Sequence, residues 1–330
     1  MRARALGILA GYLADRRWGD PQRGHPVAGF GRLAQRLEHR VWADDRRTGI
    51  GYTTALVGGA AILGCGLERT TRRSPVARFV LTAAATWTVL GGRSLESEAM
   101  AVRHRLDLID LDPAREQLTH LVGRDTTELD APDIARATIE SIAENTSDAV
   151  VAPLTAGALF GIPGLLAYRA TNTLDAMVGY RNERYLNFGW ASARLDDLLN
   201  WVPARVGAAL AALLAPTVGG TSHQALTVWR RDASGHPSPN AGQVEAAFAG
   251  ALDIRLGGVN EYGGVVEDRH TLGDGSAPFP DDIDRATKLG SLVGHASAAL
   301  AVAISILPRK REVPPRSAPT RPPSAGRRSR

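Results

Sequence analysis

Long uncharged runs interrupt an otherwise polar chain. Runs of 20 residues or more without Asp, Glu, Lys or Arg cover residues 48–67, 149–168, 206–229 and 289–308, and a shorter one covers residues 79–92. An α-helix rises about 1.5 Å per residue, so roughly 20 residues cross a hydrocarbon layer about 30 Å thick. The runs therefore predict transmembrane helices. A soluble helical protein with buried Ala-rich helices is the alternative, but several runs of spanning length in one chain favour the membrane.

The segments between the runs have helical rather than alternating patterns. Residues 93–148 predict one or two amphipathic helices followed by a helix that starts near Asp130 and Pro132. Residues 5–14 predict an uncleaved, buried or interfacial helix. Residues 231–282 are rich in Gly, Pro, Ser and Asn, which predicts a mostly loop segment. We therefore predict an all-α polytopic integral membrane protein, with four to five apolar segments in a single domain over residues 1–308.

Composition and charge exclude several classes of protein. The net charge is +5, but residues 309–330 alone carry +7, so the remainder carries −2. This Pro-, Ser- and Arg-rich tail predicts disorder, and the remaining chain gives no sign of a nucleic-acid partner. A single cysteine, Cys65, excludes an internal disulfide or a thiolate zinc site. The two lysines, Lys288 and Lys310, lie outside any GxxxxGK[ST] pattern, which excludes a P-loop.

Three carboxylates precede the second uncharged run. In ATIESIAENTSDAVVAP, Glu140, Glu144 and Asp148 recur every four residues, which places them along one helix face. Stacked like charges cost a few tenths of a kcal/mol per pair, so a solvated face is one interpretation. The triplet ends against the apolar run, however, where a carboxylate loses hydration. This favours a partner or a bound cation such as Mg²⁺.

A second polar group follows the same run. Arg169, Asn172 and Asp175 have three-residue spacing, which places a guanidinium, an amide and a carboxylate on one helix face. Further polar residues of the same types are Arg181, Asn182, Tyr185, Asp196, Asp197 and Asn200. Short carboxylates and amides are weak helix formers but good ligands for metals and phosphates. Hydrogen bonds between helices at membrane boundaries are the alternative for part of this set.

Two His-Pro pairs and a glycine-rich segment add weaker signals. His25 and His236 each precede a proline in a predicted loop, where a histidine serves as a general base, a phosphate ligand or an ordinary surface contact. The glycines of residues 250–264 can shape a backbone cradle for an anion.

Several motifs in order carry a resemblance to a known family. They are ESIAENTSD, YRATNTLDAM, GYRNERY, FGWASARLDD and SPNAG, with GDPQRGHPV near the start. With the apolar runs between them, they resemble the adenosylcobinamide-phosphate synthase family of cobalamin biosynthesis over nearly everything except the basic tail. Ala149, where a glycine is expected, and Gln243-Val244, where a Trp-Pro-like pair is expected, depart from the pattern. Neither change removes an ionisable group, so both bear on packing and substrate fit.

The resemblance implies a multi-pass ligase of the cell membrane. Such a protein joins a carboxyl group of the corrinoid adenosylcobyric acid to aminopropanol or its phosphate, using ATP and Mg²⁺, and ATP use requires a site facing the cytoplasm. A second copy of the chain or other cobalamin-assembly enzymes are the protein partners to expect. The alternative is a non-catalytic transporter or sensor, supported by the Gly- and Pro-broken runs. The lack of carboxylates inside the runs argues against a coupled pump.

The reaction requires a cation site, anion clamps and a base, and residue chemistry suggests an assignment. We expect the metal ligands to be Glu140, Glu144 and Asp148. We expect base or further catalytic work from Asp175, Asp196, Asp197 and His236. We expect substrate or phosphate binding by Arg169, Asn172, Arg181, Asn182, Tyr185, Asn200 and Asn240.

This assignment conflicts with a straight helix over residues 149–168. Such a helix would hold Asp148 and Arg169 about 30 Å apart, on opposite sides of the bilayer. The run contains Pro153, Gly161 and Gly164 among its helix-breaking residues. We therefore predict that it bends or packs inside the protein.

Overall fold

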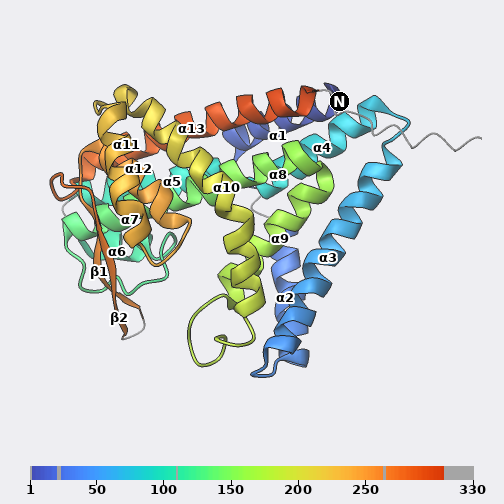
Figure 1. Ribbon diagram of the computed structural model, residues 1–330, viewed down its shortest axis with the longest axis horizontal. Helices are drawn as coiled ribbons and strands as arrows, with labels where there is room; N and C mark the ends of the chain where they lie inside the picture. The colour runs from blue at the N-terminus through green and yellow to red at the C-terminus, as the bar shows by residue number, and fades with distance from the viewer. Residues whose placement is uncertain (1, 21–23, 109–110, 263–264, 308–330) are drawn as a thin grey trace, which may run out of the picture.

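The computed structural model describes residues 2–20, 24–108, 111–262 and 265–307 (Figure 1). The basic tail that the sequence predicts to be disordered lies outside these ranges. Helices of the first half are α1 (Arg2–Trp18), α2 (Pro26–Val41), α3 (Arg46–Thr70), α4 (Pro75–Val89), α5 (Gly92–Asp107), α6 (Leu111–Leu118) and α7 (Ala131–Thr146). The second half contains a π-helical turn (Ser147–Val151), α8 (Ala152–Phe160), α9 (Ile162–Val178), α10 (Trp190–Leu214), α11 (Ser222–Asp232), α12 (Ala241–Leu252) and α13 (Pro280–Ile306). One antiparallel pair of strands, β1 (Leu256–Tyr262) and β2 (Val265–Leu272), accompanies them.

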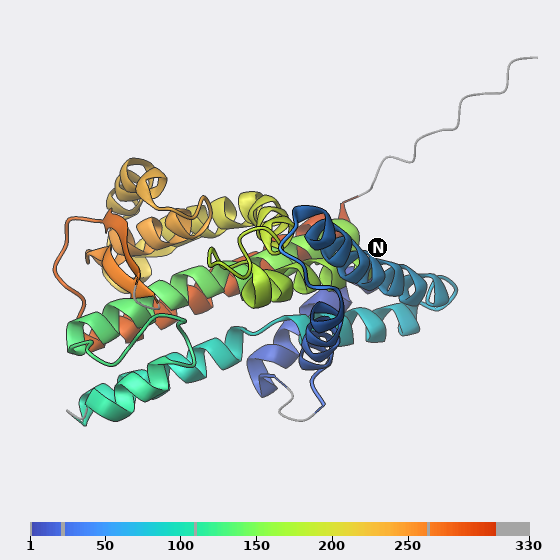
Figure 2. The same ribbon diagram turned by 90° about the horizontal axis from the view of Figure 1, so that it is seen from below.

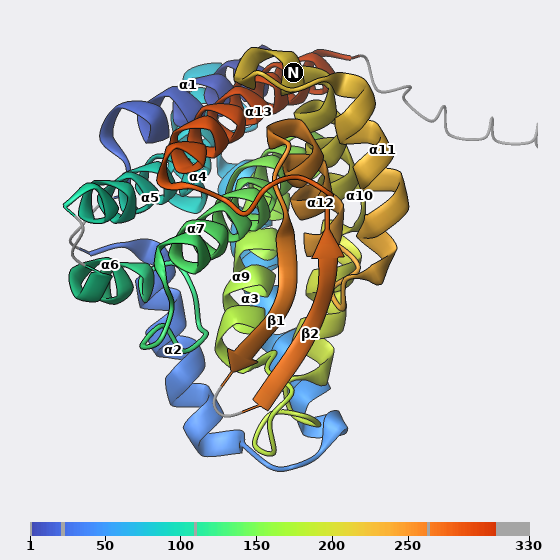
Figure 3. The same ribbon diagram turned by 90° about the vertical axis from the view of Figure 1, so that its left-hand side faces the viewer.

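The largest part of the core lies where α7, α10, α12 and α13 pack together. Figure 2 shows α7 and α13 side by side, with α5 and α6 along a flank. Every residue of α12 except Gln243 is buried, and many of them are alanines or glycines. Small side chains let helix backbones approach closely, so this short helix can be enclosed on all sides. Figure 3 shows β1 and β2 on the outer side of α7 and α12.

Three helices of the described residues are long and apolar enough to cross a membrane. They are α3, α10 extended by a 3₁₀ turn to Val218, and α13. This confirms the predicted all-α polytopic class. Helix α3 contains the uncharged run 48–67, and α13 contains the run 289–308 as far as Ile306. Figure 1 shows α3 and α13 running in clearly different directions, so the two cannot both stand upright in one flat bilayer. The run 79–92 forms only the 15-residue α4.

The prediction of one apolar helix over residues 206–229 is wrong. The helix ends in the 3₁₀ turn Ala215–Val218, and Gly219 then adopts a left-handed conformation with φ +88°. A left-handed residue stops a helix, and glycine adopts it without a steric penalty. Thr221 caps the next helix, α11, by accepting a hydrogen bond from the Gln224 amide. The uncharged run therefore covers the end of α10, the turn and most of α11 rather than one continuous helix.

The run 149–168 bends, as predicted. Pro153 lacks an amide N–H, so it cannot hydrogen-bond the carbonyl of Ala149, and the amide of Gly91 donates to that oxygen instead at 3.3 Å. Helix α8 then ends at Gly161, whose φ of +73° turns the chain into α9. Most of the run is buried within the protein. The two ends of the run therefore return toward each other.

The prediction that residues 231–282 are mostly loop is also wrong. The segment contains α12, β1 and β2. In SPNAG, Ser238 Oγ accepts hydrogen bonds from the amides of Asn240 and Ala241, which starts α12. A β-bulge between Gly257 and Val259 hides the alternating pattern of the strands. The helices predicted over residues 93–148 are found as α5, α6 and α7, and Asp130 caps α7.

Gly64 of α3 allows the close contact with the corner between α8 and α9, because a Cβ atom there would lie 2.6 Å from Pro163 Cα. We expect Gly64→Ala to force these helices apart and to destabilise the fold by about 1–3 kcal/mol. Gly66→Ala is the matched control, since its Cβ atom would meet nothing within 4 Å. Thermal unfolding in detergent measures both. Equal unfolding midpoints would contradict the close packing of α3.

Candidate acidic site

A polar cavity of about 80 Å³ lies where α7, the π turn, α9, α10 and the start of α12 meet. Five carboxylates line it, together with the amides of two asparagines and the hydroxyls of two serines. These residues are Glu144, Ser147, Asp148, Asp175, Asp196, Asp197, Asn200, Ser238 and Asn240. Among the described residues, no arginine or lysine lines the cavity. The structure thus brings together seven of the residues that the sequence analysis selected.

The π turn sets the position of Asp148. A π-helical turn carries an extra residue compared with an α-helix, and such turns are frequent at functional sites. Here it interrupts the chain between α7 and α8, just before Pro153. Asp148 therefore does not continue the straight α-helical row of Glu140 and Glu144. It lines the cavity with Glu144 instead, facing α9 and α10.

A chain of hydrogen bonds joins α9 and α10 behind the cavity. Tyr168 Oη lies 3.0 Å from the backbone oxygen of Asp148 and 2.8 Å from Asn200 Oδ1. Asn200 Nδ2 donates to Asp196 Oδ2 at 2.8 Å. Asn172 also hydrogen-bonds Asp196. These bonds fix the carboxylate of Asp196 at one oxygen, while its Oδ1 is buried without a hydrogen-bond partner.

The cavity carboxyls raise one another's pKa. Burial, then the charges of Asp196 and Glu144, raise the pKa of Asp148 well above its ordinary value. Burial also raises the pKa of Glu144, against the opposing charge of Arg269. For Asp175, burial and the charge of Asp197 raise the pKa to about 6. Perturbed carboxyls that share a cavity are typical of functional sites, because stability alone would not select them.

The second His-Pro pair supports the cavity from behind rather than lining it. His236 is almost wholly buried, and its Nδ1 accepts a hydrogen bond from the amide of Ser238 at 3.0 Å. Its Nε2 lies 3.7 Å from a carboxylate oxygen of the buried Glu245. Asn240 Nδ2 donates to the backbone oxygen of Asp197 at 2.8 Å. The loop thereby presents Ser238 and Asn240 to the cavity, and the His236 ring holds the loop.

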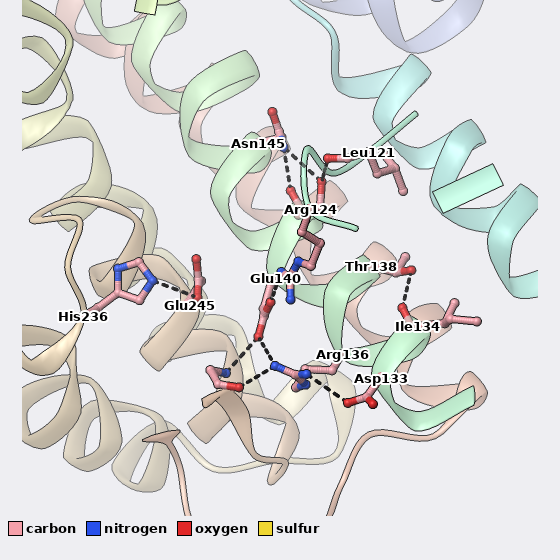
Figure 4. A network of polar contacts seen from close by, with 12 residues as sticks. Leu121, Arg124, Asp133, Ile134, Arg136, Thr138, Glu140, Asn145, His236 and Glu245 are labelled. Carbon is pink, nitrogen blue, oxygen red and sulfur yellow. Dashed lines mark hydrogen bonds and ion pairs between the residues drawn. The ribbon is translucent and has the colours of Figure 1, made fainter. Parts of the chain in front are cut away.

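Glu140 lies apart from the cavity, in a network of arginines (Figure 4). Its Oε2 pairs with Arg124, and both side chains are less than 5 % exposed. Its Oε1 accepts a hydrogen bond from the amide of Gly257 at 2.8 Å and lies 3.7 Å from Arg136. Both oxygens therefore have protein partners. The structure separates the Glu140 carboxylate from Glu144 and Asp148, the other two residues of the predicted metal set. We therefore do not assign Glu140 to a metal site.

The GYRNERY loop between α9 and α10 holds three further predicted residues outside the cavity lining. Asn182 Oδ1 accepts a hydrogen bond from the amide of Tyr185, which shapes the turn. Tyr185 Oη and the guanidinium of Arg184 both donate to Glu38 Oε1, at 2.8 and 3.0 Å. Arg181 is exposed and acts electrostatically on Asp197. The loop is thus tied to α2 and carries Arg181 beside the cavity.

Arg169 lies next to the cavity but on an adjoining face of α9. Its Nη1 donates to Asn172 Oδ1 at 3.4 Å, and Asn172 in turn contacts Asp196. Its charge acts on Asp148, so the bend in the run brings together two groups that a straight helix would separate. The proximity of Asp148 and Arg169 is what the predicted bend required.

Sequence analysis missed several residues of this region. Tyr168 connects α9 to Asp148 and Asn200, and its place beside Arg169 in YRATNTLDAM was the available signal. Glu245 is buried with no hydrogen-bond partner for either oxygen, and burial raises its pKa well above the ordinary value. Nothing in the Ala-rich sequence around Glu245 indicates that it belongs to this region. Arg124 and Arg269 approach the acidic residues from a loop and a strand, and only a three-dimensional structure reveals them.

The donor set has the chemistry of a magnesium site without being preassembled as one. Among the described residues, no group of three or more His, Cys, Asp or Glu side chains is arranged to hold a metal ion. Mg²⁺ uses oxygen ligands, keeps several waters and is commonly bound by one or two carboxylates plus substrate phosphates. The unpartnered Oδ1 of Asp196 and the carboxyls of Asp148 and Glu144 suit that mode. The residues therefore fit a cation that arrives with a phosphorylated ligand.

Helices, apolar spans and a polar cavity enclosed between them define the class: an all-α polytopic membrane protein with an acidic internal site. The family model described as CobD/Cbib protein matches residues 8–290, so this chain belongs to the CobD/Cbib family. A relative from Mycobacterium tuberculosis (strain ATCC 25618 / H37Rv), named cobalamin biosynthesis protein CobD, is 51% identical over 302 residues, 91% of this chain and 96% of the relative.

More distant relatives carry the same name. The protein from Chromobacterium violaceum is 42% identical over 92% of this chain and 97% of its own length. The one from Rhodobacter capsulatus is 39% identical over 86% of this chain and 89% of its own length. No solved structure matches.

Replacing Glu140 tests whether it is structural. Glu140→Gln keeps an acceptor for the Gly257 amide but removes the negative charge that pairs with the buried Arg124. Removing one partner of a buried pair costs about 3–5 kcal/mol, so we expect a large fall in the unfolding midpoint. Glu128→Gln, at an exposed position, is the control. An unchanged midpoint would show that the arginine network does not depend on Glu140.

Replacing Asp175 should have the opposite effect on stability. Its pKa of about 6 in the folded protein exceeds the ordinary 3.8, so the folded state retains a proton that the unfolded chain loses. Stability therefore falls as the pH rises from about 4 through 6, by on the order of 2–3 kcal/mol. We expect Asp175→Asn to remove this fall and to unfold at a higher temperature than wild type at pH 7.5. Unfolding midpoints across pH 4–8 without divalent cations measure it, and parallel profiles would be inconsistent with this account.

Proposed function

We propose that this chain acts in cobalamin biosynthesis as an ATP-dependent ligase of the cell membrane. It joins the free carboxyl group of adenosylcobyric acid to the amine of aminopropanol or its phosphate, and releases ADP and phosphate. The observation that carries the proposal is the cavity lined by five carboxylates from four helical segments, beside the buried guanidinium of Arg169. The family membership and the shared name of the relatives support the pathway.

The residues suit the requirements of amide formation. The carboxyl group of the substrate is an anion, and Arg169 offers a guanidinium for it within reach of the cavity. The incoming amine is an ammonium ion at neutral pH and must lose a proton before it can attack. Asp175, with its pKa of about 6, is mostly ionised at neutral pH and still close enough to neutrality to accept a proton readily.

The acidic lining also suits a divalent cation. Mg²⁺, if bound here, would supply positive charge that offsets the charge of a phosphate group. Asp148 and Asp196 are the residues we assign to hold it, with Glu144 beside them. Asn200 and Tyr168 keep these carboxylates oriented through the hydrogen bonds described above. Without a cation the same carboxyls are protonated or repel one another, so the site is suited to bind its phosphorylated substrate together with the ion.

The site lies among helices that the membrane is expected to hold, and ATP use places it toward the cytoplasm in this proposal. The GYRNERY loop carries Arg181 beside the cavity and is exposed to solvent over most of its length. We assign this loop to phosphate binding. A transporter or sensor would use the same broken helices but would release no ADP and form no amide.

Purified protein incubated with adenosylcobyric acid, the amino-alcohol phosphate, ATP and Mg²⁺ should yield the amide and ADP in equal amounts. We expect Asp148→Asn and Arg169→Gln each to lower turnover by at least 100-fold while membrane insertion persists. Chromatographic separation of the corrinoids measures the product. Folded wild-type protein that forms neither product would favour the transporter or sensor.

A measurement without turnover tests the cation assignment separately. Adding Mg²⁺ with a non-hydrolysable ATP analogue should raise the unfolding midpoint of the wild type, since a ligand that binds only the folded state stabilises it. Asp148→Asn should lose most of this rise, whereas Glu128→Gln should retain it. A rise of the same size in Asp148→Asn would place the cation elsewhere.

A further inference from the structure

An apolar groove of about 350 Å³ opens beside the acidic cavity, between α2, α3, α4 and α9. Its walls are formed by aliphatic and aromatic side chains of α2, by small residues of α3 and by one face of α9. Phe30, Ala55, Gly59, Leu63 and Leu166 represent these walls. The groove and the cavity use adjoining faces of α9, because residues 166, 169, 170 and 173 line the groove whereas residue 175 lines the cavity.

Among the described residues that line the groove, Arg169 is the only charged one. Its Nε is buried and has no hydrogen-bond partner, and its Nη1 contacts Asn172 Oδ1 only at a long 3.4 Å. No carboxylate of the described residues lies within ion-pair distance of it, although Asp20 and Asp148 act on it electrostatically. A buried guanidinium with unused donors is costly unless an anion satisfies it. The groove therefore ends at a position prepared for a negatively charged group.

The two hollows differ in size as well as in polarity. The cavity of about 80 Å³ has room for a small group such as a phosphate with an ion, not for a tetrapyrrole-like ring. The groove of about 350 Å³ is at the lower end of the roughly 300–1,000 Å³ typical of small-molecule sites. It can hold one edge of such a ring, with the remainder outside.

We propose that the groove receives the methyl-bearing edge of the corrin ring of the substrate, with its free carboxylate on Arg169. This inference rests on the proposed function and adds to it the binding site of the corrinoid substrate. From Arg169, Asn172 leads to Asp196, so a carboxylate held there lies at the border of the cavity where the amine and phosphate meet. The proposal also gives a role to the GDPQRGHPV motif, whose described residues contribute Pro26 and Val27 to the groove lining but nothing to the acidic cavity.

Two neighbouring glycines of α3 allow a matched test. A Cβ atom at Gly59 or at Gly58 would meet nothing within 4 Å, so a side chain can begin at either position without displacing protein atoms. Only Gly59 lines the groove. Gly59→Leu should therefore fill part of the groove, whereas Gly58→Leu adds the same side chain outside it.

We expect Gly59→Leu to raise the KM for adenosylcobyric acid at least tenfold, with kcat and the KM values for ATP and the amine changed less than twofold. Gly58→Leu should match wild type in all four constants. Unchanged corrinoid KM in Gly59→Leu would overturn the proposal. A phospholipid-dependent shift of the unfolding midpoint that Gly59→Leu abolishes, with unchanged corrinoid KM, would identify a lipid chain as the occupant instead.

Direct binding separates this inference from the proposed reaction. Equilibrium dialysis of cobyric acid against the purified protein, followed by its visible absorbance, needs no turnover. If wild type forms no amide but binds cobyric acid, and Gly59→Leu weakens that binding at least tenfold, the ligase proposal fails and the groove assignment stands. If wild type forms the amide and Gly59→Leu binds cobyric acid as tightly as wild type, only the groove assignment fails.

Discussion

Repulsion among partly or wholly buried carboxylates is the constraint on which the rest of this structure depends. Five of them surround one small cavity, and burial together with their mutual charge raises the pKa of Asp148, Glu144 and Asp175. Bringing these carboxylates together lowers the free energy of unfolding, and the packed core of α7, α10, α12 and α13 must offset this loss. Natural sequences retain a cost of this kind where function requires it. The acidic cavity is therefore the feature that the fold is built to hold.

The fold holds it by interrupting helices. A straight helix cannot bring Asp148 and Arg169 together, and two of the three local breaks around the site lie between these residues and turn the chain back. Pro153 follows the π turn, Gly161 takes a positive φ, and Pro203 lies inside α10, one turn beyond Asn200. Each break removes a backbone hydrogen bond or bends the helix axis near the cavity. In an apolar setting such breaks are tolerated only where the protein itself buries them, as it does here.

The sequence predicts much of this arrangement, but only where a signal is local. Uncharged runs locate α3 and α13, and the spacing of Arg169, Asn172 and Asp175 identifies the polar part of α9. The same pattern misled at residues 206–229, because lack of charge does not show that the left-handed Gly219 stops the helix. Helical spacing also placed Glu140 with Glu144, yet Arg124 arrives from a distant loop to pair with it. Contacts between segments far apart in the sequence, such as Arg269 beside Glu144, cannot be predicted from the spacing of residues along the chain.

Helix α9 lies between two environments, one polar and one apolar. Amide formation between a large corrinoid and a small amine would need both of them. One face of α9 carries Asp175 and borders the polar, acidic cavity, which suits a cation and a phosphate. Tyr168 and Asn172 connect this face to α10 through their hydrogen bonds. The adjoining face, through Arg169, belongs to a groove suited to an apolar ring edge. A carboxylate on Arg169 is the group that both environments can reach. In the proposed reaction a corrin is too large for the cavity and phosphate is too polar for the groove. The two substrates would then meet at this side of α9, and the broken helix explains how one element could serve both.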